Sequence, residues 1–71
     1  MTLNQFLKNN PDLQFGYYPE QNQKIIIRFW ESDKTGRDKQ LSRLLLSLKL
    51  PYCIIPRKKA FFYLILPHFY S

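Results

Sequence analysis

Residues 24–66 have the sequence KIIIRFWESDKTGRDKQLSRLLLSLKLPYCIIPRKKAFFYLIL, and their patterning indicates most of the fold. Lys24–Trp30 is rich in β-branched and aromatic residues, which favour a strand. Further along, residues 36–48 have leucines at helical spacing, and Thr35 with Asp38 resembles a capping box at the start. The leucines on one helical face are Leu41, Leu44, Leu45 and Leu48. We therefore expect a strand followed by the main helix.

A hairpin is predicted after this helix. Leu50 precedes Pro51, and a residue before proline is pushed toward extended geometry, which ends the helix. Two β-prone runs, 52–55 and 60–66, then flank the segment 56–59, Pro-Arg-Lys-Lys. The tip of this second hairpin is expected to be basic.

The residues before Lys24 predict a shorter helix and one more strand. Thr2 can cap a helix that runs to about Asn9, with apolar residues on one stripe. Apolar residues alternate with others over 13–18, and the polar segment 19–23 indicates a turn. The complete order is α-β-β-α-β-β, which predicts an α+β fold in which a four-stranded antiparallel sheet has helices on one face.

The size of the chain sets a limit on its stability. Its 71 residues form one domain, residues 1–71, and a domain of this size buries only about 60% of the surface of its unfolded chain. Hydrophobic residues at 45% and aromatic residues at 17% are still enough to build a core, which excludes a disordered basic tail. A second copy or another partner could cover what the monomer leaves exposed, so a homodimer stays open.

Cys53 is the single cysteine, which excludes an intrachain disulfide and a cysteine-cluster metal site. We expect it to be a small apolar core residue. The N-terminal residues lack the pattern of a signal peptide. The longest apolar run, Ala60 to Leu66, is far below the roughly 20 residues that span a bilayer. We therefore expect no membrane insertion and a location in the cytoplasm or another intracellular compartment.

The charge distribution changes sharply after Asp38. Residues 39–71 contain six Lys or Arg and no Asp or Glu, and they account for the whole net charge of +6. A field of one sign attracts polyanions, of which nucleic acid is the commonest, although a membrane surface or an acidic protein would fit the same physics. The pattern indicates a class of partner and no particular reaction.

The candidate phosphate contacts fall into two groups. Arg57, Lys58 and Lys59 lie at the predicted hairpin tip, where adjacent cations can contact successive phosphates. Lys39 and Arg43 lie one turn apart on the polar side of the main helix. The alternative for the tip is a solvated turn whose charges discourage edge-to-edge aggregation. Nucleic-acid binding requires these cations to converge on one surface.

A second candidate surface lies on the predicted strand 24–30. Lys24, Arg28 and Trp30 share the side opposite the core if Ile25, Ile27 and Phe29 face inward, because alternate strand residues share a face. Cations beside an aromatic ring can pair phosphates and stack a base. The alternative is that Trp30 closes the edge of the core.

Further aromatic residues in the strands also have two interpretations. They could form a stacking platform, whereas aromatic residues in strands usually pack in the core or pair across strands. The residues concerned are Tyr17, Tyr18, Tyr52, Phe61, Phe62 and Tyr63.

Catalysis has little support in the sequence. One His, one Cys and five acids show no nucleophile–base spacing, no Gly-rich phosphate loop and no metal-ligand cluster. His68 is expected to be a terminal surface residue. We expect no cofactor, no metal and no small-molecule substrate.

The segment Phe6 to Leu66 resembles a half-repeat of the LAGLIDADG homing endonucleases. The similarity lies in residues 6–12 before the first hairpin, in Lys24–Phe29, in the leucine-rich helix and in the final basic hairpin. The resemblance implies the α-β-β-α-β-β order and a curved sheet that enters the major groove of DNA.

The chain departs from this family at the end of the first helix. The family has small residues in that helix and an acidic metal ligand next to glycine, whereas this chain has Gln5, Phe6 and the segment Asn10-Pro11-Asp12. Asp12 is the one carboxylate that the resemblance could carry over as a metal ligand. These departures favour a binding module that has lost cleavage.

The leading hypothesis is therefore a small basic nucleic-acid-binding protein, with DNA or RNA as its partner. The competing hypothesis is a protein-binding regulator or inhibitor that docks an acidic partner through a basic and aromatic surface. A third, metal-dependent cleavage through Asp12, remains as an alternative.

Overall fold

The structure is a computed structural model of the chain, and it describes residues 1–18 and 24–66. It confirms the α-β-β-α-β-β order and the α+β class. The elements are α1 (Leu3–Asn9), β1 (Phe15–Tyr18), β2 (Lys24–Trp30), α2 (Arg37–Ser47), β3 (Tyr52–Arg57) and β4 (Ala60–Ile65). The turn predicted at 19–23 and the predicted surface position of His68 lie outside the described residues.

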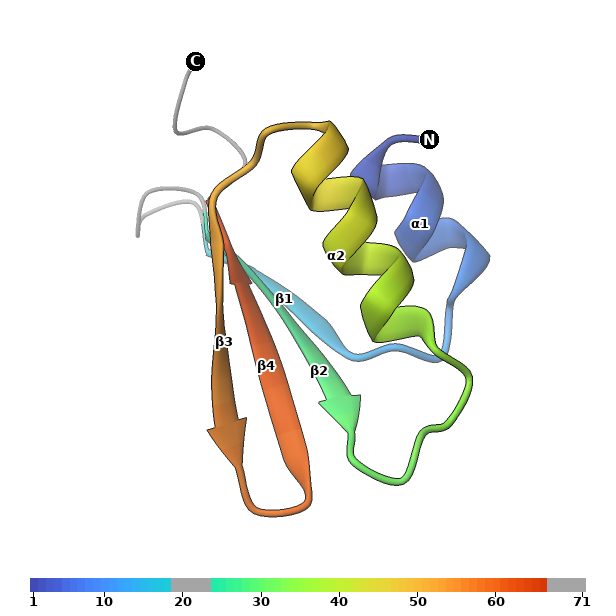
Figure 1. The fold of residues 1–71 in the computed structure, drawn as a ribbon, viewed down its shortest axis with the longest axis vertical. Coiled ribbons are helices and arrows are strands. Elements are labelled where there is room, and N and C mark those ends of the chain that lie inside the picture. Colours follow the sequence, from blue (N-terminus) through green and yellow to red (C-terminus); the bar gives the residue numbers. More distant parts are fainter. Residues whose placement is uncertain (19–23, 67–71) are drawn as a thin grey trace.

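The four strands form one antiparallel sheet in the order β1-β2-β4-β3. The two central strands, β2 and β4, pair along nearly their whole length, from Ile25 opposite Ile65 to Trp30 opposite Ala60. Both helices lie on the same face of this sheet, and no helix of residues 1–18 and 24–66 lies on the other face (Figure 1). The predicted two-layer architecture is therefore confirmed.

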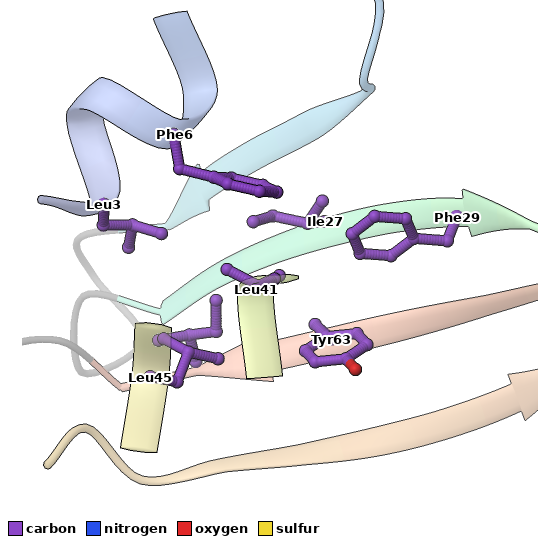
Figure 2. Packing of buried hydrophobic residues seen from close by; sticks show 8 residues of the cluster. Leu3, Phe6, Ile27, Phe29, Leu41, Leu45 and Tyr63 are labelled. Atoms are coloured by element: carbon purple, nitrogen blue, oxygen red, sulfur yellow. The ribbon is translucent and has the colours of Figure 1, made fainter. Parts of the chain in front are cut away.

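The core lies between the helices and the inner face of the sheet (Figure 2). Inward residues alternate along β2 and β4, as the pleat of a strand requires. The buried residues of this core cluster are Leu3 and Phe6 from α1, Ile27 and Phe29 from β2, Leu41 and Leu45 from α2, and Tyr63 and Ile65 from β4. Burying each large apolar side chain contributes about 1.5–3 kcal/mol. The stability of this small domain therefore depends on a few buried side chains.

Hydrogen bonds close both ends of α1, and the predicted Thr2 cap is confirmed. The Thr2 hydroxyl accepts from the Gln5 backbone N–H at 3.2 Å, and the Gln5 side chain accepts from the Thr2 backbone N–H at 2.8 Å. At the other end, the Asn10 side chain donates to the Phe6 carbonyl at 2.8 Å. Each bond satisfies a backbone group that the helix leaves without a partner.

The start of α2 differs from the prediction, because Thr35 and Asp38 form no capping box. Gly36 is the N-cap residue, with φ of +79°, and no side chain caps the helix. The Thr35 hydroxyl and backbone N–H instead donate to Asp33 Oδ1, at 2.6 and 2.9 Å. The preceding turn therefore takes the hydroxyl that the capping box would need, and glycine permits the left-handed backbone.

The aromatic residues divide between the two faces of the sheet. Tyr63 is buried, and Tyr52 and Phe61 pack against the core. The Tyr63 ring stacks on Tyr52 at a centroid distance of 5.4 Å, and Phe61 stacks on Phe29 at 5.5 Å. The other three predicted members do not belong to this packed set. Tyr17 lies on the helix side, opposite Ile25, but is 50% exposed, whereas Tyr18 and Phe62 lie on the opposite face.

Cys53 is exposed, so its assignment to the core is wrong. Tyr52 packs against the core cluster, and successive residues of a strand point to opposite faces. The thiol therefore lies on the face of the sheet away from the helices.

Neither helix in the described part of the chain has the length and apolar character that crossing a bilayer requires.

Candidate nucleic-acid interface

The face of the sheet opposite the helices is here called the outer face, and neither of the two described helices covers it (Figure 1). Its members follow from strand alternation and the pairing register. On β2 they are Lys24, Ile26, Arg28 and Trp30, on β4 Ala60, Phe62 and Leu64, and on β3 Cys53, Ile55 and Arg57. The four strands contain no Asp or Glu. The outer face is therefore cationic and apolar.

Arg28 lies at the centre of this face and is held by its neighbours. Its guanidinium carbon is 5.3 Å from the ring centroid of Trp30 and 5.3 Å from that of Phe62. Its Nη1 also donates to Gln14 Oε1 at 3.0 Å. A guanidinium over an aromatic ring is attracted by the ring quadrupole. These contacts fix the cation and both rings on the same surface.

Trp30 belongs to the outer face and does not close the edge of the core. Its neighbour Phe29 is buried, whereas the Trp30 side chain is 51% exposed. The alternation of β2 therefore confirms the predicted side for Lys24, Arg28 and Trp30. Lys24 is at the other end of β2, opposite Tyr18 of β1, so it lies apart from Arg28 and the two rings that Arg28 contacts.

The hairpin tip is tighter than its sequence indicates. β3 continues past Ile55 to Arg57, which pairs with Ala60, so only Lys58 and Lys59 form the turn. Lys59 has φ of +61°, a left-handed conformation that is unusual for a residue with a side chain. Pro56 is tolerated because β3 is an edge strand. Arg57 is consequently a strand residue on the outer face.

A hollow of about 400 Å³, here called the first hollow, opens between the tip and β2. Its lining consists of three cations, two aromatic rings and one small residue: Arg28, Arg57, Lys58, Trp30, Phe62 and Ala60. The register explains the space, because the small Ala60 lies between Trp30 and Arg57 on neighbouring strands. Four of the predicted site residues thus meet around one opening.

Lys59 lies on the other side of Trp30. It lines a second hollow of about 390 Å³ together with Trp30, Glu31, Ser32 and Lys34. The Glu31 backbone N–H donates to the Lys59 carbonyl at 3.0 Å, which ties the tip to the end of β2. Figure 1 shows the tip at the same end of the sheet as the loop after β2.

Lys39 and Arg43 do not join this surface. Both are exposed on α2, while Leu41 and Leu45 of the same helix are buried against the sheet. At 100° per residue, positions 39 and 43 lie about half a turn from positions 41 and 45. They therefore point away from the sheet, and the core separates them from the outer face. The requirement that all five cations converge on one surface is not met, so nucleic-acid binding through that combined surface is wrong. Any binding surface is restricted to the hairpin tip together with Arg28.

Acidic side chains gather at the beginning of α2. Arg37 Nη1 lies 2.8 and 2.9 Å from the two carboxylate oxygens of Asp12, and Arg37 Nη2 pairs with Asp33. Hydrogen bonds from Thr35 and then from Arg37 hold the pKa of Asp33 far below its usual range. Asp12 is thus engaged in an ion pair that connects the segment before β1 to α2. Among the residues the structure describes, no three His, Cys, Asp or Glu side chains form a metal-binding group.

Comparison with known proteins gives no match. No protein-family model, curated protein or solved structure matches the chain significantly. Function is therefore inferred from the outer face itself.

The cations and aromatic rings around the first hollow have the features of an anion-binding surface on which a planar group can stack. Cations at the tip can neutralise phosphates, and the half-exposed Trp30 ring offers area for stacking. Sequence reasoning missed Phe62, Ala60 and Lys34 as members of the two hollows. Alternation in residues 60–66 places Phe62 opposite the core, but its contact with Arg28 depends on the pairing of β2 with β4.

Proposed function

We propose that the protein binds nucleic acid through the outer face of its sheet. The observation that carries the proposal is the first hollow, where three cations and two aromatic rings meet on a face whose strands contain no acidic residue. Phosphates would contact Arg28, Arg57 and Lys58, and Lys59 would add a fourth charge from the other side of Trp30. The open sheet face also accords with the resemblance to a homing-endonuclease half-repeat.

The proposed contacts predict how binding depends on salt. Neutralising a phosphate releases condensed counterions, so log affinity falls with log salt by about 0.9 per contact for duplex DNA and about 0.7 for single strands. Four contacts give a slope of roughly −3 to −4. This slope is shallower than the slope expected for a surface that also included Lys39 and Arg43.

The test compares two double variants that remove the same charge. Arg57→Gln with Lys58→Gln alters the first hollow, whereas Lys39→Gln with Arg43→Gln alters the exposed side of α2. Binding of labelled random DNA and RNA is measured by anisotropy over a range of salt concentrations. The first variant should make the slope shallower by about 1.4 to 1.8, and the second should leave it unchanged.

Two results would count against the proposal. A wild-type protein that binds no DNA or RNA in dilute buffer would remove nucleic acid as the partner. Equal losses in the two double variants would show that net charge matters and that the outer face does not.

A second candidate function is docking of an acidic protein on the same face. The observation that favours it is the aliphatic strip of Ile26, Leu64 and Ile55, which runs across β2, β4 and β3 beside Arg28. Nucleic acid makes little use of such a strip, whereas protein interfaces have apolar centres. A partner captured by the purified protein should remain bound after nuclease treatment under this alternative, and should be released if nucleic acid links the two.

A further inference from the structure

Trp30 lines both hollows, the first on the outer face and the second at the end of the sheet beside the loop after β2. The indole lines the first hollow with Arg57 and Lys58, and it lines the second with Lys34 and Lys59. Half of its surface is exposed, at 51%. A large ring in this position can be approached by a planar group while cations stand on either side.

The neighbours of Trp30 keep the ring in place and leave space beside it. Arg28 lies over both the Trp30 and Phe62 rings, at 5.3 Å from each centroid, and Gln14 accepts a hydrogen bond from Arg28 at 3.0 Å. Ala60 is the cross-strand partner of Trp30, and its methyl group is the only side chain between Trp30 and Arg57 in that row. A ring that is already ordered loses little entropy when a ligand packs on it.

We propose that Trp30 is a base-stacking residue and that the outer face selects single-stranded nucleic acid over duplex. The inference rests on the proposed function and names its substrate class. In a duplex both faces of each base are covered by neighbouring bases, whereas an unpaired base can leave the strand and stack on an aromatic side chain. Stacking of this kind tolerates any base, so the surface has no need of residues that recognise base edges.

The charges around the ring suit the path of a single strand. Arg57 and Lys58 stand on one side of Trp30 and Lys34 and Lys59 on the other, so phosphates on both sides of a stacked base meet a cation. Glu31 also lines the second hollow and weakens phosphate binding there, because its carboxylate repels a phosphate. The strongest phosphate contacts are therefore on the side of the first hollow.

The experiment uses Trp30 itself as the reporter, since it is the one tryptophan in the chain. Selectively excited indole fluorescence is followed while the intact protein is titrated with unstructured DNA and RNA oligonucleotides of about 12 nucleotides, a length that single-strand-binding surfaces cover. A duplex of the same length is titrated in parallel. Both single strands should quench the emission, and the duplex should bind less tightly without quenching it.

Three variants separate stacking from charge and from folding. Trp30→Ala should weaken single-strand binding about 10- to 100-fold and change duplex binding little, while Trp30→Phe should retain most of the single-strand affinity. Ala60→Leu fills the first hollow without altering charge and should also weaken single-strand binding. Circular dichroism checks that each variant is folded, and Trp30 is exposed enough for its replacement to leave the core intact.

The failure of this inference differs from the failure of the proposed function. Equal affinity for duplex and single strand, with unchanged emission and no effect of Trp30→Ala, would overturn base stacking but leave nucleic-acid binding in place. Absence of binding to every polynucleotide would overturn both. Quenching by RNA alone, or by DNA alone, would support stacking and identify which nucleic acid is bound.

Discussion

The substitution Tyr63→Phe tests how α2 is held on the sheet, because it removes one hydroxyl from the core. Tyr63 is 2% exposed on β4, and its hydroxyl donates to the Asp38 carbonyl at 3.1 Å and is hydrogen-bonded to the Ser42 hydroxyl. These contacts join the central strand to the first turns of α2. They therefore connect the two layers of the fold through a polar group.

The expected loss of stability follows from these two bonds. Each contributes about 0.5–1.5 kcal/mol net, which gives about 1–3 kcal/mol for both. The Ser42 hydroxyl can turn toward the carbonyl four residues earlier, that of Asp38, and this recovers part of the loss. We expect Tyr63→Phe to lower the free energy of unfolding by about 1–2 kcal/mol, and each kcal/mol corresponds to roughly 4–8 °C in Tm for a domain of this size.

Urea unfolding followed by circular dichroism measures the change, and Tyr52→Phe is the matched control. Tyr52 stacks on Tyr63 at 5.4 Å, yet its hydroxyl has no hydrogen-bond partner among the described residues. The control should change stability by less than about 0.5 kcal/mol. Equal losses in both variants, or no loss in Tyr63→Phe, would refute the role of the hydroxyl.

The loss of stability at alkaline pH provides a second comparison of Tyr63→Phe with Tyr52→Phe. Burial raises the pKa of Tyr63 above its ordinary value of 10.0. The unfolded chain therefore ionises first, so this contribution is complete below about pH 10 and is lost as the pH rises further. Tyr63→Phe should lack that part of the alkaline loss, whereas Tyr52→Phe should retain it.

The remaining predictions concern the start of α2. Gly36→Ala should lower the free energy of unfolding by about 1–2 kcal/mol. Nothing lies within 4 Å of the added Cβ, so the cost comes from the left-handed backbone, with φ of +79°. Gly36→Asn should cost less in the same urea measurement, and equal costs in the two variants would contradict this cause. Hydrogen bonds from Thr35 and Arg37 lower the pKa of Asp33, so its contribution is present above the ordinary pKa and is lost as pH falls below about 4. The stability difference between wild type and Asp33→Asn should therefore be larger at neutral pH than in acid, and a difference independent of pH would refute the ion-pair role.

Local patterns predicted the elements well because the forces that form them act between near neighbours. The alternation in Lys24–Trp30 and the leucine spacing in α2 indicate which face each element buries, and the structure confirms the strand face. On the helix it confirms Leu41, Leu44 and Leu45, whereas the predicted Leu48 is the C-cap residue and is exposed. Thr2 was also found as a cap, since its partner Gln5 is only three residues away. Each of these features is encoded within a few positions of the chain.

The predictions for the start of α2 and the end of β3 were wrong because nearby groups compete for the same partners. Thr35 has the right spacing for a capping box with Asp38, but Asp33 accepts both of its donors first. The strand β3 extends to Arg57 because β4 pairs with it there, although Pro56 indicated a turn. A pattern lists the available partners of a group, and only the folded geometry shows which one it contacts.

By itself, the sequence determined the order of helices and strands, the buried faces of β2 and of the two helices, and the excess of positive charge in the C-terminal half. Tertiary structure decided which cations share a surface. Strand pairing brings Arg57 and Lys58 beside Arg28 and Trp30, whereas helix packing directs Lys39 and Arg43 to the opposite side of the core. Charge is a property of single residues, but a binding surface depends on distances between residues far apart in the chain, and those distances are set by register and by the packing of the layers.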